Sequence, residues 1–321
     1  MVKIAGTISV GLLAGLSLAP IGTAQMERPA PAEALQVDLP DEGVVVPMLH
    51  QLHLPALEVM INGEGPFKMG FDSGASGYIS FNQDVVDRLG LEKVDTITAS
   101  DGAGRNAREV DVYGVATLQI GDAVFHDLDG HVGAYNRGPL AQNPIDGIIG
   151  IGLFSGLTLT LDYPNETISV SREALGAPDG ATILALHNNE PVPTIDLTIG
   201  ANTIRAHLDA RNMGGLNAPS SIIENHTLLG EPVNIGVART QFNEIPIQAA
   251  QFGGDVALGR YTLHQPAIVF ADVFRTANVG SRIMQEFEVT FDMANFRVRF
   301  LRHGDEPIAV PMPQPRPAPQ N

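Results

Sequence analysis

The sequence predicts an all-β protein made of two homologous, β-barrel-like lobes with a cleft between them. Three observations support this fold class. Short apolar runs with period-two patterning recur along the chain, for example at 57–61, 158–162, 194–199 and 296–300. The chain also contains 34 glycines and 23 prolines, which suit many short strands joined by tight turns. Finally, an internal repeat relates the two halves of the chain.

The repeat consists of landmarks that follow one another in the same order in each half. Each half contains a glycine nine residues before an aspartate, and later a glycine twelve residues before a second aspartate. The landmarks are Gly63, Asp72, Gly150 and Asp162 in the first half, and Gly200, Asp209, Gly280 and Asp292 in the second. We therefore predict lobes at 47–175 and 190–302, joined by a segment containing Pro178, Asp179 and Gly180. Helices are expected only at 82–89 and, more briefly, at 281–287.

Composition limits the classes of function. The chain has 321 residues, enough for one or two domains with a substantial core. Its 36 acidic and 19 basic side chains give a net charge of −17, which disfavours binding to nucleic acids or anionic lipids. The absence of cysteine excludes disulfides, thiolate metal sites and a cysteine nucleophile.

The repeated aspartate predicts general acid–base chemistry by a pair of carboxyl groups. The strand that ends at Phe71 delivers Asp72 into a run of small residues, which leave the carboxyl group accessible. If the lobes pack about a pseudo-two-fold axis, Asp72 meets its counterpart Asp209. Two carboxylates roughly 3 Å apart hold one proton between them. The ionised member can then take a proton from water while the protonated member polarises a peptide carbonyl, with no metal and no organic cofactor.

The motif FDSGASGYIS, followed by DGIIGIGLFSGLTLTLDYPNETISV, resembles the pepsin–retropepsin superfamily of aspartic proteases. The pattern is most similar to that of bacterial two-repeat aspartyl proteases, and the resemblance covers about 47–302. It implies that Asp72 and Asp209 are the catalytic dyad. It also implies supporting positions at Ser73, Gly74 and Ala75 in the catalytic loop and at Ile148, Ile149 and Gly150 beneath it. A flap that closes over a peptide is expected at Asp101, Gly102, Ala103 and Gly104.

The second lobe departs from the family pattern after Asp209. Ala210 lacks the hydroxyl that interlocks the two loops in the family, and the charge of Arg211 could hold both carboxyl groups as anions. Two functions therefore stay open: an aspartic endopeptidase, or a catalytically weak or inactive relative that binds peptides or proteins. A dimer that shares Asp72 from two chains is disfavoured, because the second lobe already occupies that face.

Other motifs favour structural roles. Asp162 and Asp292 precede turns and are expected to cap them. The pair His50 and His53, and the group 126–131 with two histidines and two aspartates, lie in strand-like stretches, where a metal site is disfavoured. The run 74–77 is one residue short of the Gly-x-Ser-x-Gly motif of serine hydrolases.

The two ends of the chain predict export and extended segments. Residues 1–24 have a positive start, an apolar stretch and small residues before a cleavage position, as in a signal peptide. We expect a Pro-rich linker at 25–46 and a disordered Pro-rich tail at 303–321. The expected protein is periplasmic or secreted, monomeric, and acts on an extended peptide or protein. No nucleic acid and no membrane beyond the signal segment are expected as partners.

Overall fold

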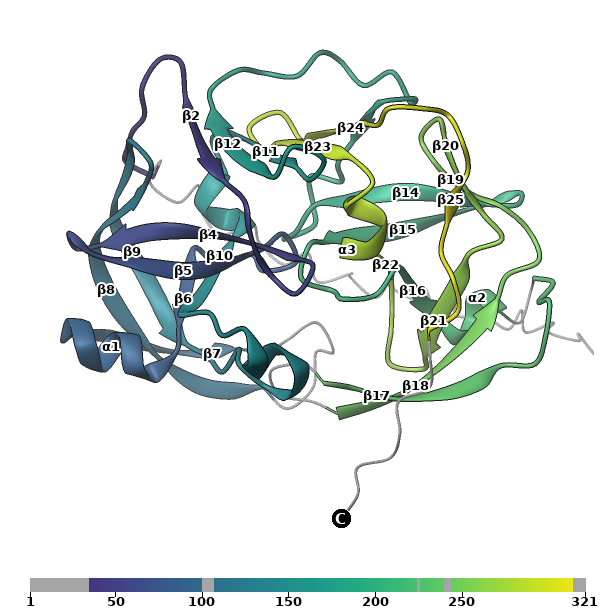
Figure 1. The fold of residues 1–321 in the computed structure, drawn as a ribbon, viewed down its shortest axis with the longest axis horizontal. Helices are drawn as coiled ribbons and strands as arrows, with labels where there is room; N and C mark the ends of the chain where they lie inside the picture. Colours follow the sequence, from purple (N-terminus) through teal and green to yellow (C-terminus); the bar gives the residue numbers. More distant parts are fainter. Residues whose placement is uncertain (1–34, 100–106, 224–225, 240–243, 314–321) are drawn as a thin grey trace, which may run out of the picture. The chain divides into compact units, whose positions relative to one another are not determined.

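The computed structural model describes residues 35–99, 107–223, 226–239 and 244–313. Within these ranges the regular secondary structure is mostly strand, with a few short helices (Figure 1), so the all-β prediction is confirmed. None of the helices in the described ranges is long and apolar enough to span a membrane.

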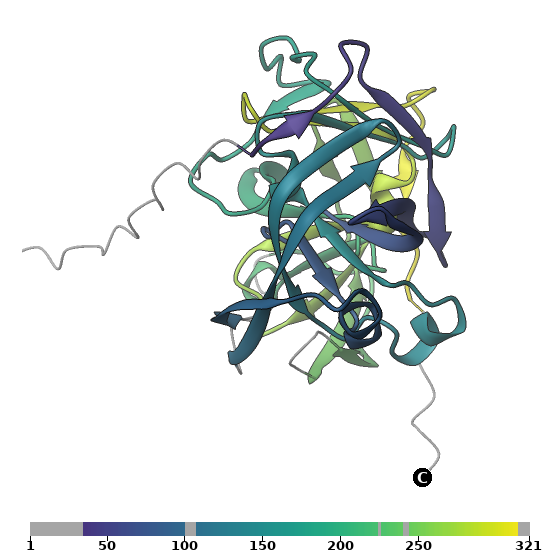
Figure 2. The ribbon, with the colours of Figure 1, turned by 90° about the vertical axis from the view of Figure 1, so that its left-hand side faces the viewer.

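The first lobe is a sheet that closes on itself. Its strands run in the order β1-β9-β6-β10-β5-β4-β8-β7, and β9 also pairs with β8, which completes a barrel. Figure 2 shows this lobe facing the viewer. The strands are β1 (Val37–Asp38), β3 (Leu49–Gln51), β4 (Leu54–Ile61), β5 (Glu64–Asp72), β6 (Ile79–Phe81), β7 (Lys93–Ala99), β8 (Arg108–Ile120), β9 (Ala123–Val132) and β10 (Gly147–Gly150). The helices are α1 (Gln83–Leu89), which matches the prediction, and the 3-10 turns η1 (Gly138–Gln142) and η2 (Ile151–Phe154).

The second lobe repeats the arrangement around its first aspartate. In both lobes a strand ending in aspartate pairs in parallel with a strand ending in glycine: β5 with β10, and β15 with β22. Its strands are β14 (Thr194–Ile199), β15 (Asn202–Asp209), β16 (Leu216–Pro219), β17 (Val233–Arg239), β18 (Glu244–Gln251), β19 (Val256–Leu258), β20 (Tyr261–His264), β21 (Ala267–Ala271), β22 (Ala277–Gly280) and β25 (Ile308–Ala309). The helices are α2 (Ser220–Ile223) and α3 (Ser281–Met284), the latter shorter than predicted.

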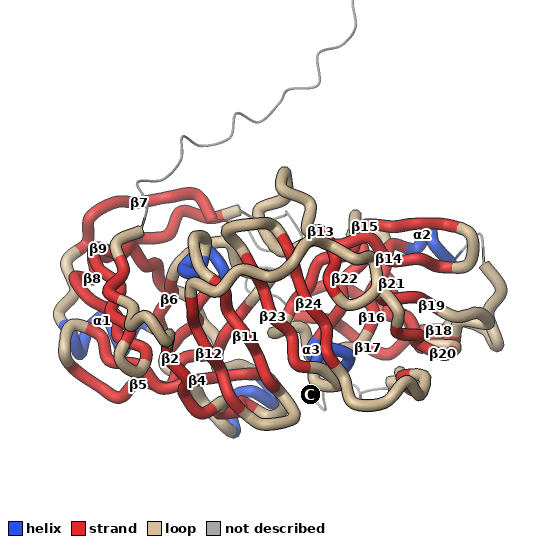
Figure 3. Tube along the Cα trace, turned by 90° about the horizontal axis from the view of Figure 1, so that it is seen from above, coloured by secondary structure: helices blue, strands red, loops and turns tan. Residues whose placement is uncertain are grey.

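A third sheet takes strands from both halves of the chain. Its order is β13-β24-β23-β11-β12-β2, and these strands lie side by side in Figure 3. The strands are β2 (Val44–Pro47), β11 (Thr158–Asp162), β12 (Thr167–Ser171), β13 (Ile183–Ala185), β23 (Glu288–Asp292) and β24 (Arg297–Leu301). At its centre Thr160 lies opposite Thr290, and their hydroxyl oxygens are 3.0 Å apart. Because each threonine lies two residues before the repeated aspartate, the local two-fold axis passes between them.

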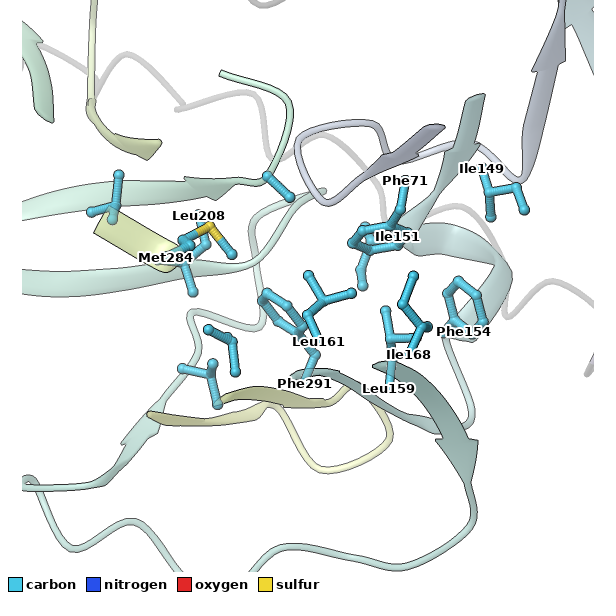
Figure 4. Close-up of a cluster of buried hydrophobic side chains, with 14 of the residues drawn as sticks. Phe71, Ile149, Ile151, Phe154, Leu159, Leu161, Ile168, Leu208, Met284 and Phe291 are labelled. Atoms are coloured by element: carbon cyan, nitrogen blue, oxygen red, sulfur yellow. The ribbon is translucent and has the colours of Figure 1, made fainter. Parts of the chain in front are cut away.

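The apolar core continues from this shared sheet to the strands that carry Asp72 and Asp209. Leu159, Leu161 and Phe291 of the sheet are fully buried, and they belong to the same cluster as Phe71 and Leu208 (Figure 4). Phe71 and Leu208 immediately precede the two aspartates. Burial of these side chains therefore holds the ends of β5 and β15 in place.

Two predicted boundaries differ from the structure. The linker predicted at 25–46 includes β1 and most of β2, because the apolar run at 44–46 completes an edge of the shared sheet by pairing with β12. The tail predicted at 303–321 includes β25, which pairs with β20, and Val310 beyond it is buried. The predicted signal peptide at 1–24 and the last residues, 314–321, lie outside the described ranges.

Candidate active site

The first loop starts where β5 ends at Asp72. Its partner in the parallel strand β10 is Gly150, and a Cβ atom there would lie 2.3 Å from the Gly77 carbonyl oxygen and 2.7 Å from that of Ala75. The loop therefore folds directly over Gly150, which must be glycine. The Gly74 N–H donates a 2.8 Å hydrogen bond to Asp72 Oδ1.

The isoleucines before Gly150, predicted to support the catalytic loop, lie on the strand that pairs with β5. Ile149 is fully buried opposite Phe71, and Ile148 is nearly so, opposite Gly70. The structure thus places Ile148, Ile149 and Gly150 along β5, beside the strand that carries Asp72. The predicted supporting strand and the Asp72 loop form one unit.

The second loop follows a similar backbone path despite its altered sequence. β15 ends at Asp209, and the Arg211 N–H donates to Asp209 Oδ1 at 3.0 Å, as Gly74 does to Asp72. Gly280 of β22 lies opposite Asp209, and a Cβ atom there would lie 2.4 Å from the Gly214 carbonyl oxygen. Arg211 therefore preserves the backbone donor that the loop needs.

The two loops pack directly on each other. A Cβ atom on Gly74 would lie 2.9 Å from Cγ of Asp209, so this glycine leaves room for the second carboxyl group. The buried Ser73 hydroxyl donates to the Leu208 carbonyl oxygen at 2.8 Å and accepts from the Ala210 N–H at 2.9 Å. Ala210 has no hydroxyl that could make the equivalent hydrogen bonds to the first loop, so only the Ser73 side chain links the two loops in this way. Asp72 and Asp209 thus share one site.

A protein-family model described as aspartyl protease matches residues 57–153. Residues 57–153 therefore form an aspartyl protease domain. The matched range runs from β4 through Asp72 to η2, and the second lobe follows it along the chain. No curated protein matches the chain.

The Arg211 side chain crosses from the second lobe to the first. Its Nη2 donates to Gln51 Oε1 at 2.5 Å, and a Cβ atom on Gly70 would lie 2.1 Å from Nη1. Gly70 and Asp72 share a face of β5, so the guanidinium lies beside the Asp72 carboxyl group. The sequence left open that the charge of Arg211 holds both carboxyl groups as anions. Among the described residues, however, its hydrogen-bond partner is Gln51, and Nη1 is buried with no such partner.

Electrostatics favours a proton on Asp72. Burial, together with the neighbouring Asp209 charge, raises the pKa of Asp72 to about 7. The Arg211 charge and the Gly74 N–H act in the opposite direction and only partly offset this. A carboxyl group that ionises near neutral pH is suited to serve as a general acid.

Tyr135 also belongs to the surroundings of the two aspartates. Its hydroxyl donates to the Ser80 hydroxyl at 2.6 Å, and burial raises the pKa of Tyr135 to about 12, so the side chain stays neutral. The charges of Asp72 and Arg211 both act on it. Tyr135 and Gln51 escaped the sequence analysis because nothing in the repeat marks them.

The predicted flap lies only partly within the described residues. The arms of the predicted flap pair as β7 and β8 up to Ala99 opposite Arg108. The tip itself, Asp101, Gly102, Ala103 and Gly104, lies outside the described residues. Asp162 and Asp292 accept hydrogen bonds from backbone N–H groups three residues later, as expected of turn caps.

The histidines considered above as metal ligands contact different partners in the structure. His50 Nε2 lies 3.4 Å from a Glu166 carboxylate oxygen, and His53 contacts the Met213 carbonyl oxygen at 3.1 Å. His126 Nε2 lies 2.8 Å from Asp38 Oδ2. Within the described ranges, no group of three metal-ligating side chains comes together.

Proposed function

We propose that the chain is an aspartic endopeptidase that hydrolyses peptide bonds through a water activated by Asp72 and Asp209. The observation that carries this proposal is the direct packing of the two loops, in which Gly74 lies against the Asp209 carboxyl group. The match of residues 57–153 to the aspartyl protease family supports it.

The proposed reaction is general acid–base hydrolysis. Asp209 takes a proton from the bound water, and the water oxygen forms a bond to the peptide carbonyl carbon. Asp72 donates its proton to the carbonyl oxygen, which its pKa of about 7 permits over an acidic to neutral range. Collapse of the tetrahedral intermediate breaks the C–N bond, and the leaving nitrogen receives a proton from the pair. The two titrations belong to the coupled pair.

The proposal extends to substrate and compartment. The substrate is an extended peptide or protein, which pairs in part through its backbone with strands of the protease. The protein acts as a monomer without metal or organic cofactor, after export to the periplasm or outside the cell. The apolar N-terminal segment 1–24 supports export.

A second candidate is a catalytically weak or inactive domain that binds peptides in the same place. Two observations favour it. Ala210 leaves the interlock of the loops one-sided, and the Arg211 guanidinium introduces a positive charge beside Asp72. Both features would reduce the rigidity or the acidity that the dyad needs.

Peptide hydrolysis between pH 3 and 7 separates the two candidates. The endopeptidase should cleave an unstructured protein such as casein, and Asp72→Asn should abolish cleavage, while Asp122→Asn, an exposed aspartate in a turn, should not. Activity that survives Asp72→Asn would overturn the proposal. Binding without cleavage at any pH would support the second candidate. Ala210→Thr combined with Arg211→Gly should then raise activity if the altered loop is the defect.

A further inference from the structure

Three hydrogen bonds run in one direction toward the Asp209 carboxyl group. The Gly214 N–H donates to Asn212 Oδ1 at 2.9 Å, and Asn212 Nδ2 donates to Asn278 Oδ1 at 2.7 Å. Asn278 Nδ2 then donates to Asp209 Oδ2 at 2.9 Å. Both asparagines are partly buried, so these bonds are shielded from competition with water.

The start of this chain determines the orientation of every amide in it. A backbone N–H can only donate, so the Asn212 atom that meets Gly214 is its oxygen. Its nitrogen therefore faces the oxygen of Asn278, and the nitrogen of Asn278 faces Asp209. The last group must accept. The other carboxyl oxygen, Oδ1, also accepts, from the N–H groups of Arg211 and Asn212.

Among its described residues, the first lobe has no equivalent of this hydrogen-bond chain. Asn278 lies two residues before Gly280, as Ile148 lies two residues before Gly150, and both strands pair in the same parallel register with the aspartate strand. The amide thus replaces an apolar residue on the side where Ala210 lacks a hydroxyl. The loop after Asp209 thus lacks a side-chain hydroxyl, and Asn278 of the neighbouring strand β22 provides a polar contact to Asp209 instead.

We propose that Asn278 is a positioning residue that holds Asp209 as the proton acceptor of the pair, and so leaves the shared proton on Asp72. This inference rests on the proposed endopeptidase function, and it deepens that function by assigning different roles to the two carboxyl groups. Asn212 orients Asn278 and acts one step further from the reacting atoms.

The groups whose charges act on Asp209, or on which it acts, come from several elements. They are Asp72 of β5, Arg211 of its own loop, Tyr163 after β11 and His207 of its own strand. A substitution at position 278 leaves all four unchanged. A changed pH profile would therefore report the lost amide donor.

The test is the substitution Asn278→Ile, because isoleucine is the residue at the equivalent position, Ile148, of the first lobe. We expect kcat to fall about ten- to a hundredfold with KM within about threefold, because one hydrogen bond to a charged group is lost. The acid limb of the kcat/KM profile should move to higher pH. Asn278→Asp removes the donor and also adds a carboxylate beside Asp209, so its acid limb should move further in the same direction. Asn202→Asp makes the same charge change at the exposed start of β15 and should leave the profile unchanged.

A second measurement does not depend on catalysis. In protein with ¹³C-labelled aspartate carboxyl groups, the Asp209 signal is identified by its absence in Asp209→Asn. In Asn278→Ile the midpoint read from this signal, which belongs to the coupled pair, should rise by about one pH unit or more. An unchanged midpoint, or an equal shift in Asn202→Asp, would overturn the inference. If the wild-type protein cleaves nothing, the proposed function fails, while this titration still decides the role of Asn278.

Discussion

The contact between Gly70 and Arg211 is predicted to couple the two lobes energetically. In Gly70→Ala the new methyl group would lie 2.1 Å from Arg211 Nη1 and 3.0 Å from Cδ1 of Ile145. The guanidinium must therefore move, and its hydrogen bond to the fully buried Gln51 is lost or weakened. Overpacking costs about 1–3 kcal/mol, and the lost charged hydrogen bond costs a similar amount.

Because the side chain of Arg211 can move and so relieve part of the clash, we expect Gly70→Ala to lower the free energy of unfolding by about 2 kcal/mol. In an Arg211→Ala background the clash with the guanidinium is absent, and the same substitution should cost less than about 1 kcal/mol. Gly156→Ala, where the added methyl group meets nothing within 4 Å, is the matched control.

Urea denaturation followed by circular dichroism measures this double-mutant cycle. The expected coupling energy between the two positions is at least about 1 kcal/mol. Equal costs of Gly70→Ala in the two backgrounds would refute the contact between the Arg211 side chain and β5.

Two further predictions concern stability. Burial raises the pKa of Asp72 from 3.8 to about 7, so ionisation of this group costs the folded state stability as the pH rises from about 4 to 7. Asp72→Asn should therefore stabilise the protein by up to about 4 kcal/mol at pH 8 and hardly at pH 4. Urea midpoints at both pH values measure this, and an equal gain at both would contradict it. Ser73→Ala should destabilise by about 1–3 kcal/mol, because the buried groups of Leu208 and Ala210 lose their partner. Ser76→Ala, exposed in the same loop, should change the urea midpoint little; a similar loss in both variants would argue against the interlock.

The sequence predicted the parts of the site that depend on local spacing. The interval from Gly63 to Asp72 is the length of one strand, and the same hairpin recurs before Asp209. Alternating apolar residues predicted the strands, and the glycines at 150 and 280 marked the parallel partners. Local periodicity and small residues carry this information within each repeat.

Contacts between distant segments could not be predicted in this way. Gln51 and Arg211 are 160 residues apart, and only the packing of the lobes brings them together. Residues 44–46 were predicted as part of a linker because Pro29, Pro31 and Pro40 precede them, whereas their partner β12 follows more than 100 residues later. The repeat could have drawn attention to Asn278, since it is a polar residue at a position where the first lobe has Ile148. No sequence pattern, however, identifies its partner Asn212.

The central claim is that aspartates from both lobes form one hydrolytic site. Cleavage of an unstructured protein by Asp209→Asn, measured beside Asp72→Asn and the control Asp122→Asn, tests it most directly. The account predicts that both dyad variants remain folded and bind peptide but lose at least about a hundredfold in kcat/KM, while the control retains wild-type activity. Wild-type cleavage by Asp209→Asn would contradict it.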